Sequence, residues 1–508
     1  MRPRKRIGGL VLGFDIGTTN CKAALYTASG QMIGESSAPL TIDRPVPRWV
    51  EQDAESYWKA ASRAIRRLLR KTGISGNEIM AIGSCGQTPT LVLVDTAGKP
   101  IRPAIVWQDT RAQDEADELR HSVGRDVMRE LLGMDLPIEP TYPPARLLWL
   151  KRNEPQVMDR VYKILQPKDF VNLKLGGEIF SDAWDSKGLV HQETGLPHPD
   201  YYQRLGIDAT IAPRVISPCE VGAQITPWAS KITGLAVGTP IVTGWSDALT
   251  GILGTGALVD ESHAFDLSGT SEIVGIVSRP QTIQNAQVLV APVVDRTAIM
   301  VYGPTQSSGD SILWFGEHFG KPASTDRMKA RDVERVARQV TGGNGELIFL
   351  PYLQGERAPI WDSRARGAFL GISKNHCRAD FALAVLEGIA FSVRHVLDTA
   401  ERATNLKAEQ VHLGGGGAAS GLMNRIKASV LNREVMVPDR LETGTLGAAI
   451  LASVGAGIYS DLETAAAAMV NVASRIAPEK STLAYYQEKY ERYTQFYSLL
   501  RPVFGTLR

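Results

Sequence analysis

A short run of small and polar residues near the N-terminus carries groups that hold phosphate. Residues 15–22 read DIGTTNCK and lie between two apolar stretches. Small residues let the backbone approach a phosphate, hydroxyls and amides donate to its oxygens, and the ammonium of Lys22 adds positive charge. The carboxylate of Asp15 is suited to a hydrated Mg²⁺. The segment is therefore predicted to be a phosphate-binding hairpin turn, and an ordinary hairpin turn is the alternative.

A second turn of similar composition follows much later in the chain. Residues 265–271 (FDLSGTS) echo residues 14–19 (FDIGTT), with a one-residue offset at the turn. Gly269, Thr270 and Ser271 supply the same kinds of donor. Two donor-rich turns from opposite halves can clamp one polyphosphate across a cleft, which neither can do alone. The echo predicts two topologically similar halves.

Asp247 is the candidate for proton transfer. It lies in the segment TGWSDA at 243–248, which follows a strand-like run at 241–243. An aspartate in this place can accept the proton of a substrate hydroxyl during phosphoryl transfer. A cap or turn residue is the alternative, and it is the commoner role of a lone aspartate at a strand end.

A glycine run in the second half is the candidate for contact with a nucleotide. Residues 415–420 read GGGAAS, follow the apolar residues Val411 and Leu413, and precede a predicted helix that begins near Leu422. A planar base or a phosphate can rest against such bare backbone, and a tight strand-to-helix turn is a compatible interpretation. The run does not continue as GxGxxG, and the sequence has no GxxxxGK[ST] motif. A dinucleotide site and a P-loop are therefore disfavoured.

Two polar segments of the first half are candidates for binding a polyhydroxylated ligand. One contains Gln87 and Thr88, and the other contains Trp107, Asp109 and Arg111. Their amide, hydroxyl, indole, carboxylate and guanidinium groups near strand ends suit such a ligand. The alternative is that these are ordinary polar side chains at the protein surface and that Trp107 is a buried core residue.

The elements that must position these residues alternate between helix and strand. A helix is predicted at 54–70 and strands at 91–94 and 241–243, an alternation that favours α/β architecture. Residues 445–456 are predicted to form a buried helix, and residues 483–500 an amphipathic terminal helix.

Length and composition indicate how many domains these elements form and which class of protein is disfavoured. The 508 residues exceed what one hydrophobic core usually supports, so two large domains are expected. A glycine-rich run at 251–256 is predicted to be a hinge, which divides the chain into 1–253 and 254–508. The formal net charge of +2 lacks the strong basicity of a general nucleic-acid binder.

Cysteine usage and hydropathy bear on the compartment. The four cysteines form no CxxC pair, which argues against a zinc site or a disulfide framework and favours a reducing cytoplasm. The basic run at 2–6 is interpreted as a solvated tail, because Asp15 follows before an adequate apolar stretch accumulates. No apolar stretch reaches the length that a transmembrane helix needs.

Taken together, these segments resemble the FGGY family of carbohydrate kinases, and the match extends from Phe14 to about Tyr459. The order and spacing of the motifs are more specific than any one motif. The resemblance implies α/β architecture with two ribonuclease-H-like domains of the actin/hexokinase ATPase superfamily and an interdomain cleft. It also implies ATP and Mg²⁺ as cofactors and a small sugar or polyol as the partner. Neither nucleic acid nor a membrane is expected, the location is expected to be cytoplasmic, and a homodimer is one option for the assembly.

The resemblance assigns roles to individual residues. Asp247 becomes the catalytic base, with Ser246 in place of the family's second glycine, and Asp15 and Asp247 hold the metal. Residues 442–449 (ETGTLGAA) look like the family's closing motif. Nucleotide binding is assigned to Gly17, Thr18, Thr19, Asn20, Lys22, Gly269, Thr270, Ser271, Gly309, Gly415, Gly416, Gly417, Ala418 and Ser420. Sugar binding is assigned to Gln87, Thr88, Trp107, Asp109, Arg111, Ser246 and Asp247.

The acceptor is the least defined part of the resemblance. Xylulokinases carry a Met-His pair after the Gly-Gln and glycerol kinases an Arg-Glu pair, whereas this chain has Gln-Thr-Pro at 87–89. Residues 355–362 (GERAPIWD) look closer to gluconate and xylulose kinases, and Trp184 and Lys187 interrupt a small-residue run common in the family. A ketopentose such as xylulose or ribulose is the favoured acceptor. A polyol or sugar acid, such as erythritol, xylitol or gluconate, is the alternative.

Two functions of other classes are weighed against sugar phosphorylation. An actin-like or chaperone-like ATPase shares the paired phosphate hairpins and would turn over ATP without a sugar. The polar loops at Gln87 and Trp107 weigh against it. A sugar-sensing protein would bind the ligand without transfer, and the retained Asp15, Lys22 and Asp247 weigh against that function.

Overall fold

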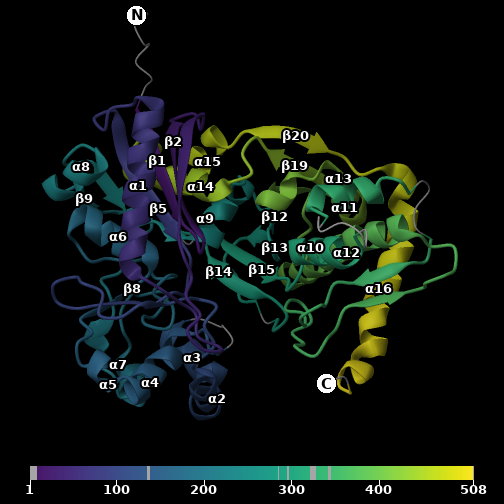
Figure 1. Cartoon of the computed structure of the whole chain (residues 1–508), viewed down its shortest axis with the longest axis horizontal. Coiled ribbons are helices and arrows are strands. Elements are labelled where there is room, and N and C mark those ends of the chain that lie inside the picture. The colour runs from purple at the N-terminus through teal and green to yellow at the C-terminus, as the bar shows by residue number, and fades with distance from the viewer. Residues whose placement is uncertain are drawn as a thin grey trace, which may run out of the picture. The chain divides into compact units, whose positions relative to one another are not determined.

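The computed structural model describes residues 9–133, 138–283, 285–294, 297–320, 328–340 and 345–506. These residues form two compact units. Unit 1 contains the described residues up to Gly254 together with Gly444–Val470, and unit 2 contains those of Thr255–Thr443 and those from Asn471 onward. Each unit holds a mixed β-sheet with helices packed against it (Figure 1).

The sheet of unit 1 is built around the predicted N-terminal hairpin. Its order is β3-β2-β1-β5-β10-β9, and β11 pairs with β5 beside this path. The strands are β1 (Leu10–Ile16), β2 (Asn20–Thr27), β3 (Met32–Pro39), β5 (Ile79–Gly86), β9 (Val221–Gln224), β10 (Pro240–Val242) and β11 (Trp245–Ser246). β1 is antiparallel to β2 and parallel to β5, which places Asp15 opposite both Lys22 and Cys85. The predicted hairpin is confirmed.

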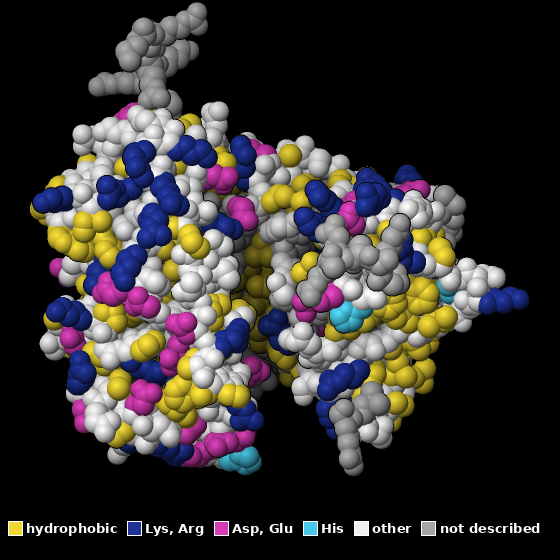
Figure 2. All heavy atoms as spheres, viewed as in Figure 1, with side chains coloured by type: hydrophobic (Ala, Val, Ile, Leu, Met, Phe, Trp, Pro, Cys, Tyr) yellow, Lys and Arg dark blue, Asp and Glu magenta, His cyan; other side chains and the backbone are white. Residues whose placement is uncertain are grey.

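The helix predicted at 54–70 is α1, which spans Ala54–Thr72. The side chain of Asp53 caps its first turn by accepting from the amide of Glu55, and Gly73 ends it with a left-handed φ of 66°. Its buried face packs on β2 and β3. Its exposed face carries all six of its lysines and arginines, and Figure 2 shows a run of basic side chains along α1.

Helix α14 (Thr443–Gly455) is the buried helix predicted at 445–456, and it packs on the sheet of unit 1. A Cβ on Gly13 of β1 would lie 1.9 Å from the carbonyl oxygen of Thr445, and one on Gly83 of β5 would lie 1.9 Å from that of Ala448. The predicted division of the chain placed this segment in the second half. In the structure residues 444–470 return to unit 1, because glycines in both strands allow α14 to approach their backbones.

The sheet of unit 2 repeats the arrangement of unit 1. Its order is β14-β15-β13-β12-β18-β19-β20. The strands are β12 (His263–Ser268), β13 (Glu272–Ser278), β14 (Leu289–Pro292), β15 (Ile299–Pro304), β18 (Gln410–Gly414), β19 (Glu434–Pro438) and β20 (Val472–Ile476). β12 is antiparallel to β13 and parallel to β18, as β1 is to β2 and β5. The predicted similarity of the two halves is confirmed.

Three long helices pack within unit 2. They are α12 (Arg378–Thr404), α13 (Gly421–Leu431) and α16 (Leu483–Phe504). The predicted terminal helix is confirmed in α16, which buries Tyr486, Tyr490 and Tyr493 against α12 and its neighbours. Helix α13 begins one residue after Ser420, close to the predicted start near Leu422.

The remaining elements connect these layers. In unit 1 they are β4 (Glu51–Gln52), β6 (Val92–Val94), β7 (Ala104–Ile105), β8 (Lys163–Leu165), α2 (Gln113–Ser122), α3 (Gly124–Leu132), α4 (Pro143–Asn153), α5 (Pro155–Met158), α6 (Pro167–Gly176), α7 (Pro199–Leu205), α8 (Pro227–Thr233), α9 (Asp247–Leu253) and α15 (Leu462–Met469). In unit 2 they are β16 (Ile348–Leu350), β17 (Ala368–Leu370), α10 (Gly309–His318) and α11 (Ala330–Ala337). The run predicted as a hinge begins inside α9, and the units divide after Gly254. None of the described helices has the length and apolar character that a bilayer crossing requires.

Candidate active site

The first predicted phosphate turn joins β1 to β2 and is stabilised by buried side-chain amides. The amide of Gly17 donates to the Asn20 carbonyl at 3.0 Å, which closes the turn. Gln52 Nε2 donates to the Thr18 carbonyl at 2.8 Å, and Gln87 Nε2 donates to Gln52 Oε1 at 2.8 Å. Thr19 and Asn20 are exposed. The turn is therefore fixed by the buried Gln87 and Gln52 while its tip faces solvent.

Three strand ends bring Asp15 and Asp247 to the same edge of the sheet. Asp15 on β1 and Trp245 on β11 both pair with Cys85 of β5. Asp247 follows β11 directly and is the first residue of α9, where its Oδ1 accepts from the amide of Ala248 at 2.7 Å. Burial, together with the negative charge of Asp15, raises the pKa of Asp247 to about 7. A carboxyl with such a pKa can take up and release a proton near neutral pH.

Ser246 and Cys85 are direct neighbours of these two carboxylates, because Ser246 precedes Asp247 and Cys85 pairs with Asp15. Ser246 is buried on β11 and pairs with Gly86. Burial and the nearby charges of Asp15 and Asp247 raise the pKa of the Cys85 thiol well above its usual value, so Cys85 stays a neutral thiol. Ser246 therefore belongs to the sheet edge that presents Asp247, and its contact with a sugar stays a prediction.

A buried lysine that was not predicted as a site residue faces this edge. Lys187 Nζ donates to Thr88 Oγ1 at 3.1 Å and to the Trp184 carbonyl at 3.2 Å. Burial lowers the pKa of Lys187, while the charges of Asp185, Asp182 and Asp247 act in the opposite direction. Its only signal in the sequence is the interruption of a small-residue run. The structure brings together Thr88, Lys187 and Asp247.

A second lysine fixes the segment that carries Lys187. Lys168 Nζ, at the start of α6, lies 2.6 Å from Asp169 Oδ1, 2.9 Å from Asp182 Oδ2 and 3.2 Å from Asp185 Oδ2. All four side chains are buried. Because a buried charge without a partner is costly, this cluster holds residues 182–187 in one arrangement.

The other predicted sugar residues separate into two environments. Trp107 is 39% exposed, and its Nε1 donates to Thr18 Oγ1 at 3.0 Å, so its ring lies beside the first turn. Asp109 is fully buried and accepts from Arg111 Nη2 at 2.8 Å, while Arg111 Nη2 also lies 2.7 Å from Glu51 Oε1. The carboxylate and the guanidinium are thus engaged in an internal network that ties the loop to β4.

The second predicted phosphate turn joins β12 to β13 in unit 2. The amide of Gly269 donates to the Ser271 carbonyl at 2.9 Å, and Gly269 and Thr270 are exposed. The amide of Gly309 donates to the Gly269 carbonyl at 3.1 Å, so the start of α10 is attached to the turn. Arg357 Nη2 donates to Ser271 Oγ at 3.3 Å. The structure brings Gly309 to the second turn, and its role in nucleotide binding stays a prediction.

The glycine run 415–420 lies against the same turn. Gly415 has a φ of +77°, and a Cβ there would lie 2.4 Å from the Ser268 carbonyl oxygen. Gly416 and Gly417 are exposed, whereas Ala418 is buried. Ser420 Oγ accepts from the amide of Met423 and caps α13. Bare backbone at Gly416 and Gly417 is therefore available to a ligand, while Ala418 and Ser420 shape the turn.

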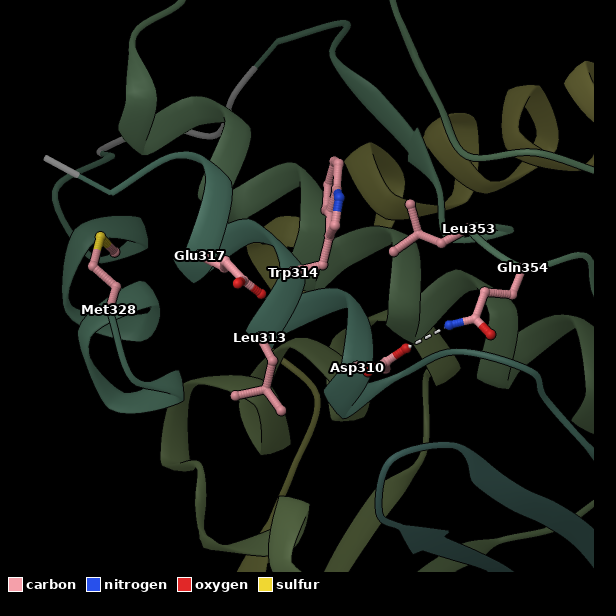
Figure 3. A pocket seen from close by; sticks show the side chains of 7 residues that line it. All are labelled: Asp310, Leu313, Trp314, Glu317, Met328, Leu353 and Gln354. Atoms are coloured by element: carbon pink, nitrogen blue, oxygen red, sulfur yellow. Dashed lines mark hydrogen bonds between the residues drawn. The ribbon is translucent and has the colours of Figure 1, made fainter. Parts of the chain in front are cut away.

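A cavity of about 530 Å³ opens beside α10 in unit 2 (Figure 3). Apolar side chains of Leu313, Trp314, Met328 and Leu353 line it together with the polar groups of Asp310, Glu317 and Gln354. Gln354 Nε2 donates to Asp310 Oδ2 at 3.2 Å. The amide of Asp310 also donates to the Thr270 carbonyl at 3.2 Å, so the cavity adjoins the second turn. Such a lining suits a flat, partly polar ring. No motif in the sequence indicated this cavity.

The two carboxylates of unit 1 fit a metal that is shared with phosphate. The described residues contain no group of three or more His, Cys, Asp or Glu side chains that could hold an ion by themselves. Asp15 and Asp247 are close enough for the charge of Asp15 to raise the pKa of Asp247. Mg²⁺ typically uses one or two carboxylates and completes its shell with waters and substrate phosphates. The pair therefore fits the predicted magnesium site.

Paired hairpin turns on duplicated mixed sheets, with a titrating aspartate at one sheet edge, define a phosphotransferase of the actin/hexokinase ATPase fold. Family models give the family: the N-terminal domain of the FGGY family of carbohydrate kinases matches residues 10–254, and the C-terminal domain matches residues 267–456. The chain belongs to the FGGY family of carbohydrate kinases. It is an enzyme that phosphorylates an alcohol group of a carbohydrate.

Relatives and solved structures agree with this membership. The chain is 31% identical over 502 residues to a xylulose kinase of Lactococcus lactis subsp. lactis, with 96% of each chain covered. A structure of ligand-bound xylulose kinase from Lactobacillus acidophilus aligns with a TM-score of 0.88 at 26% identity and covers 98% of this chain and 99% of its own. A gluconate kinase structure from Lactobacillus acidophilus aligns with a TM-score of 0.88 at 25% identity and the same coverage.

Proposed function

We propose that this kinase transfers the γ-phosphate of ATP to a primary hydroxyl of a ketopentose, with xylulose or ribulose as the favoured acceptor. The observation that carries the proposal is the placement of Asp247 at the sheet edge with a pKa of about 7, beside Asp15 and Lys187. The similarity to xylulose kinases supports a ketose. A cytoplasmic location is proposed with it, because ATP is supplied there.

Each group of residues then has a distinct task. Asp247 accepts the proton of the attacking hydroxyl, and Thr88 and Lys187 donate to other oxygens of the acceptor. The amides and hydroxyls of the turns at 17–20 and 269–271 hold the phosphates of ATP. Asp15 and Asp247 would hold Mg²⁺, which neutralises phosphate charge when bound. Asp247 Oδ1 accepts from the amide of Ala248, and this hydrogen bond fixes the carboxylate. Its other oxygen can therefore face the substrate hydroxyl without a change of side-chain conformation.

The charges around Lys187 favour a neutral acceptor. Two lysines, Lys168 and Lys187, lie among the carboxylates of Asp169, Asp182, Asp185 and Asp247. Burial raises the pKa of Asp169, Asp185 and Asp247 and lowers the pKa of Lys187, so this cluster offers little net positive charge to a carboxylate on the acceptor. Lys187 can still donate a hydrogen bond to a carbonyl or hydroxyl oxygen. A ketose meets this requirement better than a sugar acid.

A sugar acid is the second candidate, and the similarity to a gluconate kinase structure favours it. The two candidates differ in the charge of the acceptor. An acceptor panel therefore separates them directly, since a kinase for sugar acids would prefer gluconate over the neutral ketoses and polyols.

The experiment is a coupled ADP-release assay with Mg-ATP against ketoses, polyols, aldoses and sugar acids. It includes a control without sugar and the variant Asp247→Ala. We expect release with one or a few ketoses, and loss of that release in Asp247→Ala. Release of ADP without any sugar, at the same rate as with it, would instead support an actin-like ATPase. Preference for gluconate would support the sugar-acid alternative.

A further inference from the structure

A buried lysine in unit 2 joins every segment of that unit to which nucleotide binding is assigned. Lys427 lies on α13 and is 1% exposed, so it cannot touch a ligand at the exposed turn. Its Nζ lies 2.6 Å from Asp266 Oδ2, 2.8 Å from Ser268 Oγ and 2.9 Å from Glu272 Oε1. Asp266 and Ser268 precede the turn on β12, and Glu272 follows it on β13. One ammonium group therefore fastens both sides of the turn.

The same network reaches the start of α10. Glu272 Oε1 also accepts from Ser308 Oγ at 2.8 Å, and the amide of Glu272 donates to Thr305 Oγ1 at 3.0 Å. Ser308 immediately precedes Gly309, the first residue of α10, and its amide donates to the Thr270 carbonyl at 2.9 Å. The position of α10, and of the cavity beside it, is thus coupled to Lys427 through Glu272.

The glycine run is coupled to Lys427 through Ser268 and through α13 itself. A Cβ on Gly417 would lie 2.5 Å from the Ser268 Cβ, so the run rests directly on Ser268. Helix α13 begins directly after the run, and Ser420 caps it. Asn424 Nδ2 donates to the Ala418 carbonyl at 2.8 Å, which adds a second tie between α13 and the run.

The charges make this arrangement specific to a lysine. Burial alone would lower the pKa of Lys427, but Asp266 and Glu272 together raise it, so the ammonium stays charged. Burial and the charge of Glu272 already raise the pKa of Asp266 to about 7, so without the cation this pair takes up a proton, recruits water or moves apart, and in each case the bonds to Nζ are lost. The turn, the start of α10 and the glycine run would lose their common anchor.

We propose that Lys427 is a positioning residue that preorganises the nucleotide half of the site, so that unit 2 binds the adenine nucleotide through segments fixed before the ligand arrives. This inference rests on the proposed function. Preorganisation raises affinity because the cost of ordering the binding segments is met during folding. Loss of Lys427 should therefore weaken nucleotide binding and leave acceptor binding unchanged, since the acceptor residues belong to unit 1.

The test measures binding of Mg-ADP to the full-length protein by calorimetry, with KM for ATP and for the acceptor. Lys427→Met should raise the Kd for Mg-ADP about tenfold and the KM for ATP in parallel, with the acceptor KM within about twofold of wild type. The matched control is Lys489→Met. Lys489 is also buried in unit 2, on α16, and pairs with Glu387 of α12 at 2.5 Å. Lys489→Met should lower Tm and leave the Kd for Mg-ADP within about twofold of the wild-type value.

Ser268→Ala provides a milder variant should Lys427→Met fail to fold. It removes one bond of Lys427 and keeps the Cβ that contacts Gly417. We expect a smaller rise in the Kd for Mg-ADP, about threefold. Unchanged Mg-ADP affinity in folded Lys427→Met, or in Ser268→Ala where the first variant does not fold, overturns the inference. Wild-type protein that binds no Mg-ADP would instead overturn the proposed function, and this inference with it.

Discussion

Asp247 occupies a place where burial and a neighbouring carboxylate tune its acidity. It follows β11, and the strand pairings through Cys85 bring it to the edge that also holds Asp15. A carboxylate with an ordinary pKa is a weak base, whereas one with a pKa of about 7 is matched to proton transfer at neutral pH. The role proposed for Asp247 therefore depends on its environment, and an aspartate in ordinary surroundings would not be matched to it.

Replacement of Asp247 tests this role directly. Asp247→Asn keeps the shape of the side chain and removes the base, so kcat should fall about 10³-fold or more. Binding of ADP without Mg²⁺, measured by calorimetry, should stay within about threefold of wild type, because Asp247 would contact the metal and the acceptor and not the nucleotide itself. Asp208→Asn, which alters an exposed capping aspartate of the same unit, should leave kcat unchanged. Near-normal turnover of Asp247→Asn would contradict the assignment.

The pH dependence of activity follows from the same pKa. The base must be ionised to accept a proton, so kcat/KM should rise with pH through a limb centred at about 7. The effect on stability has the opposite sign. The folded state binds the proton of Asp247 more tightly than the unfolded state, so this residue's contribution to stability is present at low pH and is lost as pH rises through about 7. A flat kcat/KM profile between pH 6 and 8 would argue against Asp247 as the base.

Lys187 should affect the acceptor and not the nucleotide. Lys187→Met keeps the length of the side chain but removes the donor near Thr88, so the acceptor KM should rise about tenfold while the KM for ATP stays constant. Steady-state kinetics with the best acceptor of the panel measures both. Lys231→Met, which removes an exposed charge from α8 of the same unit, is the control. Equal effects of Lys187→Met on both KM values would point to a purely structural role.

At the scale of elements, glycines decide where α14 can lie. The Cβ of an alanine at 13 would overlap the backbone carbonyl of Thr445 at 1.9 Å, and neither β1 nor α14 can move without disturbing the sheet. Gly13→Ala should therefore destabilise the protein by about 1–3 kcal/mol, as overpacking usually does. Gly421→Ala is a matched control, because its Cβ would meet only the end of Arg425 at 3.9 Å. Chemical denaturation measures the difference, and equal stability of the two variants would exclude close packing of α14 on β1.

Much of the element pattern could be predicted from the sequence. The helix at 54–70, the hairpin that follows Gly9 and the echo at 265–271 depend on local periodicity and turn residues, and the structure contains all three. The destination of residues 444–470 could not be predicted. A buried alanine-rich helix is equally compatible with either sheet, and only the facing glycines Gly13 and Gly83 settle the choice.

The site was predictable to the extent that its chemistry is local in sequence. The turns at 17–20 and 269–271 carry their donors within a few residues, and Asp247 lies in a short motif. The roles of Lys187 and Lys427 depend on partners far away in the chain, at Thr88 and at Asp266. Burial of Asp109 and Arg111 in one ion pair likewise follows from tertiary structure, because the same pair on a surface loop would face solvent.

At the scale of the whole molecule, unit 1 is discontinuous in sequence. The chain leaves it after Gly254, builds most of unit 2, and returns at Gly444 to add α14 and α15. Besides the contact of α14 with β1 and β5, Gly30 lies so close to Met469 that a Cβ there would be 1.7 Å from the Met469 carbonyl oxygen. The final strand and helix then belong to unit 2 again. Folding of unit 1 should therefore require residues 444–470.

Fragments of unit 1 test this requirement. Residues 9–254 alone would leave the glycines of β1 and β5 and their apolar surroundings uncovered, so we expect a fragment that binds a hydrophobic dye and unfolds without a cooperative transition. Joining residues 444–470 to the same fragment through a flexible linker should restore a cooperative thermal transition, because α14 can then cover the sheet. The matched control carries Gly83→Val in the 9–254 part of the joined protein, where the new side chain would collide with Ala448 of the added segment and should abolish the gain. A cooperative transition in residues 9–254 alone would show that the return of the chain is dispensable for unit 1.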